Sequence, residues 1–209
     1  ESVASKVFLY RDNKLEEIKV DAASNTASLG FFYTFICEAC GFGQLTGEEW
    51  KIMGLAPYGK FNKDMYDLLK TIIKVNGMGF EWQMNNLISF FSDLDTFRRG
   101  YDEPPIAAAD LAYNGQLVYQ ELLFEYLNNV HDYAEKMYGK EIASNLILGG
   151  GCALNSSANG AILENTKFEH LYVYNAPGDD GNAVGAALLS YYEDNPEEHA
   201  DTKHIQSPY

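Results

Sequence analysis

The segment Asn145-Leu-Ile-Leu-Gly-Gly-Gly-Cys-Ala-Leu-Asn155 decides how the rest of the chain is organised. Its apolar run 146–148 is typical of a short buried strand, and the run stops at three glycines that favour a tight backbone turn. Asn155, Ser156 and Ser157 then offer N-cap side chains for a helix. This order brings backbone N–H groups and the positive end of a helix to one point, where an anion could bind. The alternative is that the glycines only allow the strand and the helix to pack closely.

A second glycine-bounded turn, Pro177-Gly-Asp-Asp-Gly181, follows another strand-like run at 171–174 and leads into a helical pattern over 182–192. Neither turn matches the P-loop pattern or the Gly-x-Gly-x-x-Gly dinucleotide motif. The succession of strand, glycine turn, helix, strand, acidic turn and helix predicts an α/β fold. Small residues on one face of the last helix favour close packing there, namely Ala183, Gly185, Ala186 and Ala187.

The remaining segments are predicted to form a hairpin and several helices. Strand-like runs flank a turn at 11–14, and helical patterns cover 28–40, 47–59, 63–75 and 104–138. Gly54 lies inside a helical pattern, where glycine costs about 1 kcal/mol relative to Ala and often marks close approach by a backbone or a ligand. Asn114-Gly115 is a site for a kink or break in the longest helix. The stretch 76–103 has weak periodicity.

Composition excludes several classes of protein. The 209 residues are 46% hydrophobic and carry a formal net charge of −15, which argues against non-specific binding to nucleic acid. No apolar run is long enough to cross a bilayer, so no membrane partner is expected. Three cysteines without a disulfide framework favour a cytoplasmic location. Cys37 and Cys40 have the spacing of a redox or zinc pair, but a zinc site needs more ligands, and ordinary buried thiols are the simpler interpretation.

Charged residues offer two further candidate sites. A carboxylate such as Asp180, in a glycine-bounded turn before a helix, can hold a hard cation that polarises a carbonyl under attack. The alternative for Asp179 and Asp180 is that they cap the helix that follows. Arg98 and Arg99 are adjacent, and surface ion pairs are a simpler role for them than phosphate binding.

Four motifs in order, 28–33, 49–59, 149–155 and 177–187, resemble the carbamoyltransferase family that includes nodulation-factor, tobramycin and cephamycin O-carbamoyltransferases. This family is similar to the tRNA threonylcarbamoyl-transfer proteins. The resemblance implies an actin-like ATPase (ribonuclease H-like) fold and a partial Kae1-like domain. In that interpretation residues 1–27 end the hairpin of the first lobe, 28–193 form the second lobe, and 194–209 are a linker toward a YrdC-like domain.

The resemblance also implies a reaction. A carbamoyl-adenylate, made from carbamoyl phosphate and ATP in the YrdC-like domain, passes its carbamoyl group to the hydroxyl of a small-molecule acceptor. Asn155 would contact the nucleoside with Gly150 and Gly151 nearby, and Asp180 would ligate iron or a similar divalent metal. Gly54 would line the adenosine side, with Glu49 and Lys51 in supporting roles. No catalytic base is assigned, and acceptor contacts are expected within 76–103.

The chain departs from the family at its metal site. The His-x-x-x-His pair of the family is not present, and the four histidines are expected to be ordinary surface or core residues, namely His131, His170, His199 and His204. We therefore expect that an N-terminal lobe and the YrdC-like domain are missing and that the chain is inactive alone. A sugar kinase-like phosphotransferase and a nucleotide-gated assembly module of the same fold remain alternatives.

Overall fold

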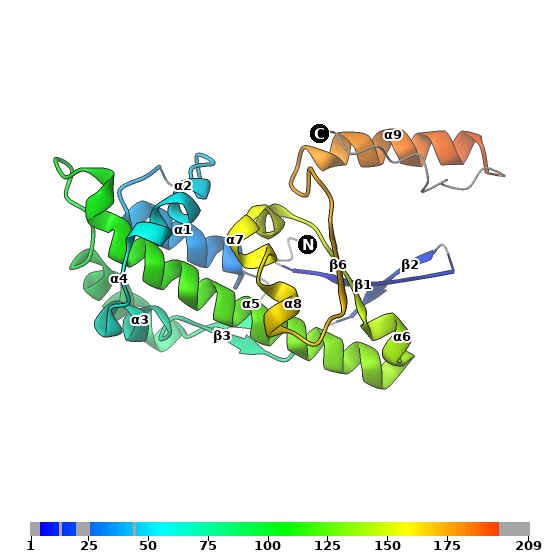
Figure 1. The fold of residues 1–209 in the computed structure, drawn as a ribbon, viewed down its shortest axis with the longest axis horizontal. Helices are drawn as coiled ribbons and strands as arrows, with labels where there is room; N and C mark the ends of the chain where they lie inside the picture. The colour runs from blue at the N-terminus through cyan, green and yellow to red at the C-terminus, as the bar shows by residue number, and fades with distance from the viewer. Residues whose placement is uncertain (1–4, 13, 20–25, 44, 197–209) are drawn as a thin grey trace.

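One long helix, α5 (Ala109–Tyr138), runs through the centre of the molecule, and much of the fold packs on it (Figure 1). The computed structural model describes residues 5–12, 14–19, 26–43 and 45–196. Buried side chains recur along α5 with helical spacing, as at Leu111, Val118 and Leu122. The helix contacts α1 (Leu29–Ala39), α2 (Trp50–Leu55) and α3 (Lys63–Leu69). The hydrophobic core therefore lies along α5.

Helix α1 begins and packs as the sequence predicts. The Ser28 side chain accepts a hydrogen bond from the Phe31 N–H at 3.1 Å, so Ser28 is the N-cap. The break considered at Asn114-Gly115 is not found, because α5 continues through these residues. A Cβ atom on Gly115 would lie 2.7 Å from Cγ2 of Ile36, so the glycine instead allows α1 and α5 to approach closely.

The strands form three two-stranded sheets. Strands β1 (Val7–Arg11) and β2 (Lys14–Ile18) form the expected hairpin, and β3 (Ile73–Asn76) pairs antiparallel with β4 (Gly79–Trp82). Strands β5 (Asn145–Leu148) and β6 (His170–Val173) are parallel, with Ile147 opposite Tyr172. The short helices between β5 and β6 make this segment a β/α crossover. The predicted α/β class is thus confirmed.

Shorter helices complete the described chain: the 3-10 turns η1 (Ala56–Tyr58), η2 (Met84–Asn86), η3 (Pro105–Ala108) and η4 (Gly151–Leu154), and the α-helices α4 (Leu87–Asp95), α6 (Lys140–Ala143), α7 (Ser156–Asn159), α8 (Ile162–Asn165) and α9 (Gly181–Asp194).

The helix predicted over 63–75 is wrong in its second half. Helix α3 ends at Leu69, and Ile73 begins strand β3 opposite Trp82. The β-branched run at 71–73 favours the strand, and pairing with β4 decides the outcome.

Helix α9 differs from the other α-helices of the described chain because none of its residues is buried, and its ribbon lies apart from α5 (Figure 1). The close packing expected on its small-residue face is not found among the described residues, where a Cβ atom on Gly185 would meet nothing within 4 Å. None of the helices in the described part of the chain combines the length and the apolar character that a bilayer crossing requires.

Candidate functional site

A cavity of about 610 Å³ lies between the start of α1, the segment leading into α2, the middle of α5 and the glycine turn after β5. Its wall is mainly apolar and aromatic, with Phe31, Trp50, Phe80, Tyr119, Leu123 and Tyr126 among the lining residues. Four of the predicted site residues reach it, namely Glu49, Gly150, Gly151 and Asn155. The fold therefore joins two motifs that lie about a hundred residues apart in the sequence. A concave, largely apolar pocket with a few polar groups is typical of a small-molecule site.

The glycine turn has a conformation that requires glycine. Gly150 has a φ of +89°, a region that side-chain-bearing residues rarely adopt. Its N–H donates to the Pro177 carbonyl at 2.7 Å, so the glycine turn and the acidic turn are hydrogen-bonded to each other. Gly151 begins η4, and the N–H groups of Gly151 and Cys152 have no backbone acceptor among the described residues. Both residues line the cavity, so two backbone donors without an acceptor among the described residues belong to its wall.

The side chain of Asn155 is held by a buried hydrogen-bond network. Its Oδ1 accepts from the Ala158 N–H at 3.0 Å, which caps α7, and from Nε2 of Gln116 at 3.1 Å. Its Nδ2 donates to Oε1 of Gln116 at 3.1 Å, and the Tyr33 hydroxyl donates to the same oxygen at 2.6 Å. Burial raises the pKa of Tyr33 well above its ordinary value, so the hydroxyl keeps its proton. Asn155 also hydrogen-bonds to the Tyr33 hydroxyl, so Gln116 and Tyr33 together hold its amide at the cavity wall.

A side chain of helix α5 also holds the backbone of the glycine turn. The Tyr119 hydroxyl donates to the Cys152 carbonyl at 3.2 Å, and its ring contacts that of Tyr33 edge to face at 5.0 Å. Gln116 and Tyr119 are three residues apart and lie on one face of the helix. The sequence analysis did not identify Gln116, Tyr119 or Tyr33 as site residues. The one feature that could have indicated them is the polar Gln116 within an otherwise apolar stripe of the helix.

Glu49 is the one residue of its predicted group of three that lines the cavity. Its Oε1 accepts a hydrogen bond from the Thr34 hydroxyl at 3.3 Å, and it does not cap α2. Gly54 lies on the exposed side of α2, and a Cβ atom there would meet nothing within 4 Å. The close approach by another part of the backbone, one of the reasons offered for this glycine, is therefore not found among the described residues.

Lys51 does not line the cavity either. Its Nζ lies 2.6 Å from Oε1 of Glu48 and 5.2 Å from the centre of the Phe42 ring. The Gly43 N–H, at 2.8 Å, and then Lys51 lower the pKa of Glu48. In the described structure Lys51 and Glu48 thus brace the segment that leads into α2.

Asp180 directly precedes α9 and is exposed. Its side chain does not cap the helix, and its carboxylate has no hydrogen-bond or ion-pair partner among the residues that the structure describes. It does not line the cavity, although Pro177, three positions earlier, accepts the hydrogen bond from Gly150. The acidic turn thus lies beside the glycine turn and presents a free carboxylate.

The other polar candidates have structural roles. Cys37 and Cys40 are free and buried, as expected. Arg98 pairs with Asp95 at 2.8 Å and with Glu38 at 3.2 Å, which confirms the surface ion pair. Arg99 instead donates to three backbone carbonyls, those of Cys40, Gly41 and Glu103. His131 is buried and His170 is exposed, whereas His199 and His204 lie outside the described residues.

The fold and the cavity define an α/β unit in which two glycine-rich turns lie side by side next to a cavity. Residues 4–188 match the family model described as the carbamoyltransferase N-terminus, and the chain belongs to this family. This membership confirms the resemblance found in the four sequence motifs.

Individual relatives cover most of this chain. It is 33% identical over 175 residues to the uncharacterized protein MJ1058 of Methanocaldococcus jannaschii, a match that covers 83% of this chain and 27% of that protein. It is 29% identical over 171 residues to the nodulation protein NolO of Bradyrhizobium diazoefficiens, covering 78% and 28%. It is 28% identical over 165 residues to the nodulation protein NolNO of Sinorhizobium fredii, covering 78% and 22%. The chain therefore spans about a quarter of the length of these relatives.

Proposed function

We propose that this chain supplies the nucleoside-binding part of an ATP-dependent carbamoyltransferase. In the proposed reaction an acceptor hydroxyl attacks the carbonyl carbon of a carbamoyl-adenylate. A new C–O bond forms, the bond between that carbon and the phosphate oxygen breaks, AMP leaves, and the hydroxyl proton passes to a base. The observation that carries the proposal is the cavity that brings Glu49, the glycine turn and Asn155 together in a member of this family.

The groups in the cavity wall suit an adenosine ligand. Aromatic side chains such as Trp50 and Tyr119 offer surfaces for a flat base. The carboxylate of Glu49 can accept from ribose hydroxyls, and the amide of Asn155 can donate to an oxygen or a ring nitrogen of the ligand in exchange for its contact with Tyr33. The free N–H groups of Gly151 and Cys152 can donate to a phosphate despite the acidic character of the chain. A volume of about 610 Å³ is typical of small-molecule sites.

Asp180 is proposed as one ligand of the divalent metal, iron or a similar ion. Its exposed carboxylate without a partner fits this role, because a hard cation prefers such oxygen ligands. When bound, the ion would supply Lewis acidity toward the carbamoyl oxygen. Asp180 provides one ligand only, and we propose that the histidine pair of the family, on another part of the complete protein, provides others. This chain's own contribution is to hold Asp180 beside the glycine turn through the Gly150–Pro177 hydrogen bond.

We further propose that the chain is part of an actin-like ATPase fold. The parallel pair β5–β6 with its helical crossover is compatible with such a fold. Residues 28–193 would then belong to the second lobe, and a first lobe and a YrdC-like domain would complete the enzyme. Relatives about three times as long are compatible with additional domains. The chain alone should show no carbamoyl transfer.

Nucleoside binding can be tested on the chain itself by calorimetric titration with AMP, the proposed leaving group. Asn155→Asp removes the amide donors and places a negative charge near the ligand, so we expect AMP affinity to fall at least about tenfold. Asn165→Asp is the matched control, because Asn165 is exposed and its amide donates only to the Ala161 carbonyl. Equal AMP affinity in wild type and Asn155→Asp would refute the proposed site. A phosphorylated acceptor as product of the complete enzyme, in place of a carbamate, would refute the proposed reaction.

A further inference from the structure

A cluster of potential metal ligands lies on α5, outside the cavity and away from the acidic turn in sequence. His131, Asp132 and Glu135 each offer one ligand atom, and these atoms all lie within 4.8 Å of one another. His131 is 6% exposed, whereas the two carboxylates are exposed to solvent. His131 and Glu135 are four residues apart and therefore share a face of the helix. The cluster thus has a buried nitrogen on one side and accessible carboxylates on the other.

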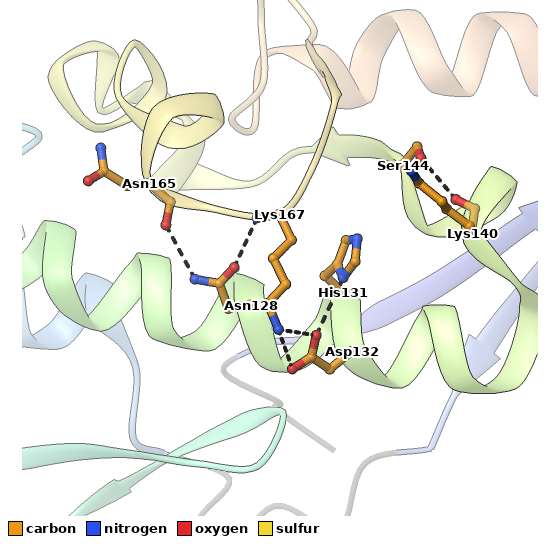
Figure 2. A network of polar contacts seen from close by, with 7 residues as sticks. All are labelled: Asn128, His131, Asp132, Lys140, Ser144, Asn165 and Lys167. Atoms are coloured by element: carbon orange, nitrogen blue, oxygen red, sulfur yellow. Dashed lines mark hydrogen bonds and ion pairs between the residues drawn. The ribbon is translucent and has the colours of Figure 1, made fainter.

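The Nδ1 atom of His131 is the feature that ordinary packing leaves unexplained. It is buried and has no hydrogen-bond partner among the described residues. It points toward Oδ1 of Asp132 at 3.5 Å, beyond the usual 2.7–3.2 Å range of N–H···O bonds (Figure 2). The ring packs edge to face on Phe168, with 5.2 Å between centres. Because buried polar atoms are rarely left without a partner, this atom needs an explanation.

The separation of these two atoms fits a shared cation. Zn–N and Zn–O bonds of roughly 2.0–2.2 Å at a tetrahedral angle place two ligand atoms about 3.3–3.5 Å apart. The observed 3.5 Å between Nδ1 of His131 and Oδ1 of Asp132 lies at the end of that range. The Glu135 carboxylate is close enough to give a third ligand after a rotamer change. Three protein ligands and one water would complete the coordination.

The structure already holds a positive charge at this place. The Nζ atom of Lys167, from the segment between α8 and β6, lies 2.6 and 2.7 Å from the two carboxylate oxygens of Asp132 (Figure 2). The ammonium occupies one side of the cluster, and among the described residues Nδ1 of His131 keeps only its 3.5 Å contact with Asp132 and no hydrogen bond. A metal ion between the two side chains would satisfy that nitrogen and compete with Lys167 for Asp132.

We propose that His131, Asp132 and Glu135 form a site for a divalent transition-metal cation such as Zn²⁺, in competition with the Lys167 ammonium. The site is separate from the proposed metal ligand Asp180. Its imidazole nitrogen favours Zn²⁺ or Co²⁺ over Mg²⁺, which prefers oxygen ligands. Binding would release the Lys167 ammonium from Asp132, whereas the Lys167 N–H keeps its hydrogen bond to Asn128, and so couple the metal to one of the contacts between α5 and the segment before β6.

The full chain should be titrated with Co²⁺, whose visible absorption reports its ligands, followed by displacement with Zn²⁺. Wild type should give a spectrum of nitrogen and oxygen ligands without a thiolate charge-transfer band. Glu135→Gln should weaken Co²⁺ binding at least about tenfold, and His131→Gln more strongly. Lys167→Met removes the competing ammonium and should tighten binding about tenfold. Glu125→Gln is the matched control, because Glu125 is an exposed carboxylate of the same helix outside the cluster, and it should leave the affinity unchanged.

Several outcomes would overturn the proposal. These are the absence of Co²⁺ binding in both wild type and Lys167→Met, an unchanged affinity in Glu135→Gln, a thiolate band, or loss of binding in Glu125→Gln. Because His131 is buried, circular dichroism must show that His131→Gln is folded. If that variant fails to fold, Glu135→Gln and Lys167→Met carry the test, since both side chains are exposed.

Discussion

The glycine turn and the acidic turn have similar local sequences but very different surroundings. Each follows a strand of the same parallel pair and leads into a helical segment. The first is fixed by Gln116 and Tyr119 of α5, and its Asn155 is buried. The second leads into α9, which buries no residue and leaves Val184, Leu188 and Leu189 exposed. The comparison teaches that a strand–turn–helix pattern sets the local path, whereas packing against α5 makes a rigid site.

The largest effect is expected where the buried network is broken. Gln116→Leu removes the partner of both Asn155 and the Tyr33 hydroxyl, and it should lower the free energy of unfolding by about 2–4 kcal/mol. Urea denaturation measures this change. Gln120→Leu on the same helix is the control, because its exposed amide donates only to the Ser157 carbonyl, and it should cost less than about 1 kcal/mol. Equal costs would mean that the network does not make the glycine turn more rigid than the acidic turn.

A pair of glycine substitutions compares the two regions directly. Gly115→Ala should destabilise the chain by about 1–3 kcal/mol, because the new methyl group would meet the fully buried Ile36. Gly185→Ala in α9 meets no atom and should be neutral or stabilising by up to about 1 kcal/mol, because alanine favours a helix. Thermal unfolding followed by circular dichroism gives both values. Opposite signs are expected, and a strong loss in Gly185→Ala would contradict an exposed α9.

Substitutions at the N-termini of α1 and α9 should show a smaller difference in stability. Ser28→Ala removes the hydrogen bond to the Phe31 N–H and should cost about 1 kcal/mol. Asp180→Ala should change stability by less than about 0.5 kcal/mol, because its side chain caps nothing. Chemical denaturation of the two variants tests the difference. A cost of about 1 kcal/mol for Asp180→Ala would reveal a capping role instead of a free carboxylate.

The smallest effect concerns pH. Burial, and then the charge of Glu49, raise the pKa of Cys37 to about 11, and burial raises the pKa of Cys40 to about 12. Unfolded thiols lose protons from about pH 9, while the folded ones keep them, so stability falls as pH rises. From pH 8 to 9 the unfolding free energy should drop by about 0.5 kcal/mol. The double variant Cys37→Ala, Cys40→Ala should show a weaker pH dependence, and an unchanged slope would exclude the thiols as its cause.

Several features of the fold and site were predicted from short-range patterns. The hairpin, the Ser28 cap, the strand before the glycine turn and the α/β succession were all predicted correctly, since each depends on neighbouring residues. The ordered motifs indicated the family, which the comparison with the family model confirms. Glu49, Gly150, Gly151 and Asn155 were predicted site residues that line the cavity, although their functional roles stay predictions.

Other features depend on contacts between segments far apart in the chain. The helix expected over 63–75 ends early because β3 pairs with β4, and Gly115 allows close contact with Ile36 within a continuous helix. Lys51 has a helical position that suits either a cavity or a surface, and its contact with Glu48 holds it away from the cavity wall.

By itself the sequence determined the local elements, the order of the two glycine-bounded turns and the family, because caps, periodicity and turn residues act over a few positions. Only the tertiary structure decided that Gln116 and Tyr33 hold Asn155, that α9 remains exposed, and that His131 faces Asp132 without a hydrogen bond. The physical reason is that burial and hydrogen-bond partners are set by which helices meet. No single segment of the sequence encodes that choice.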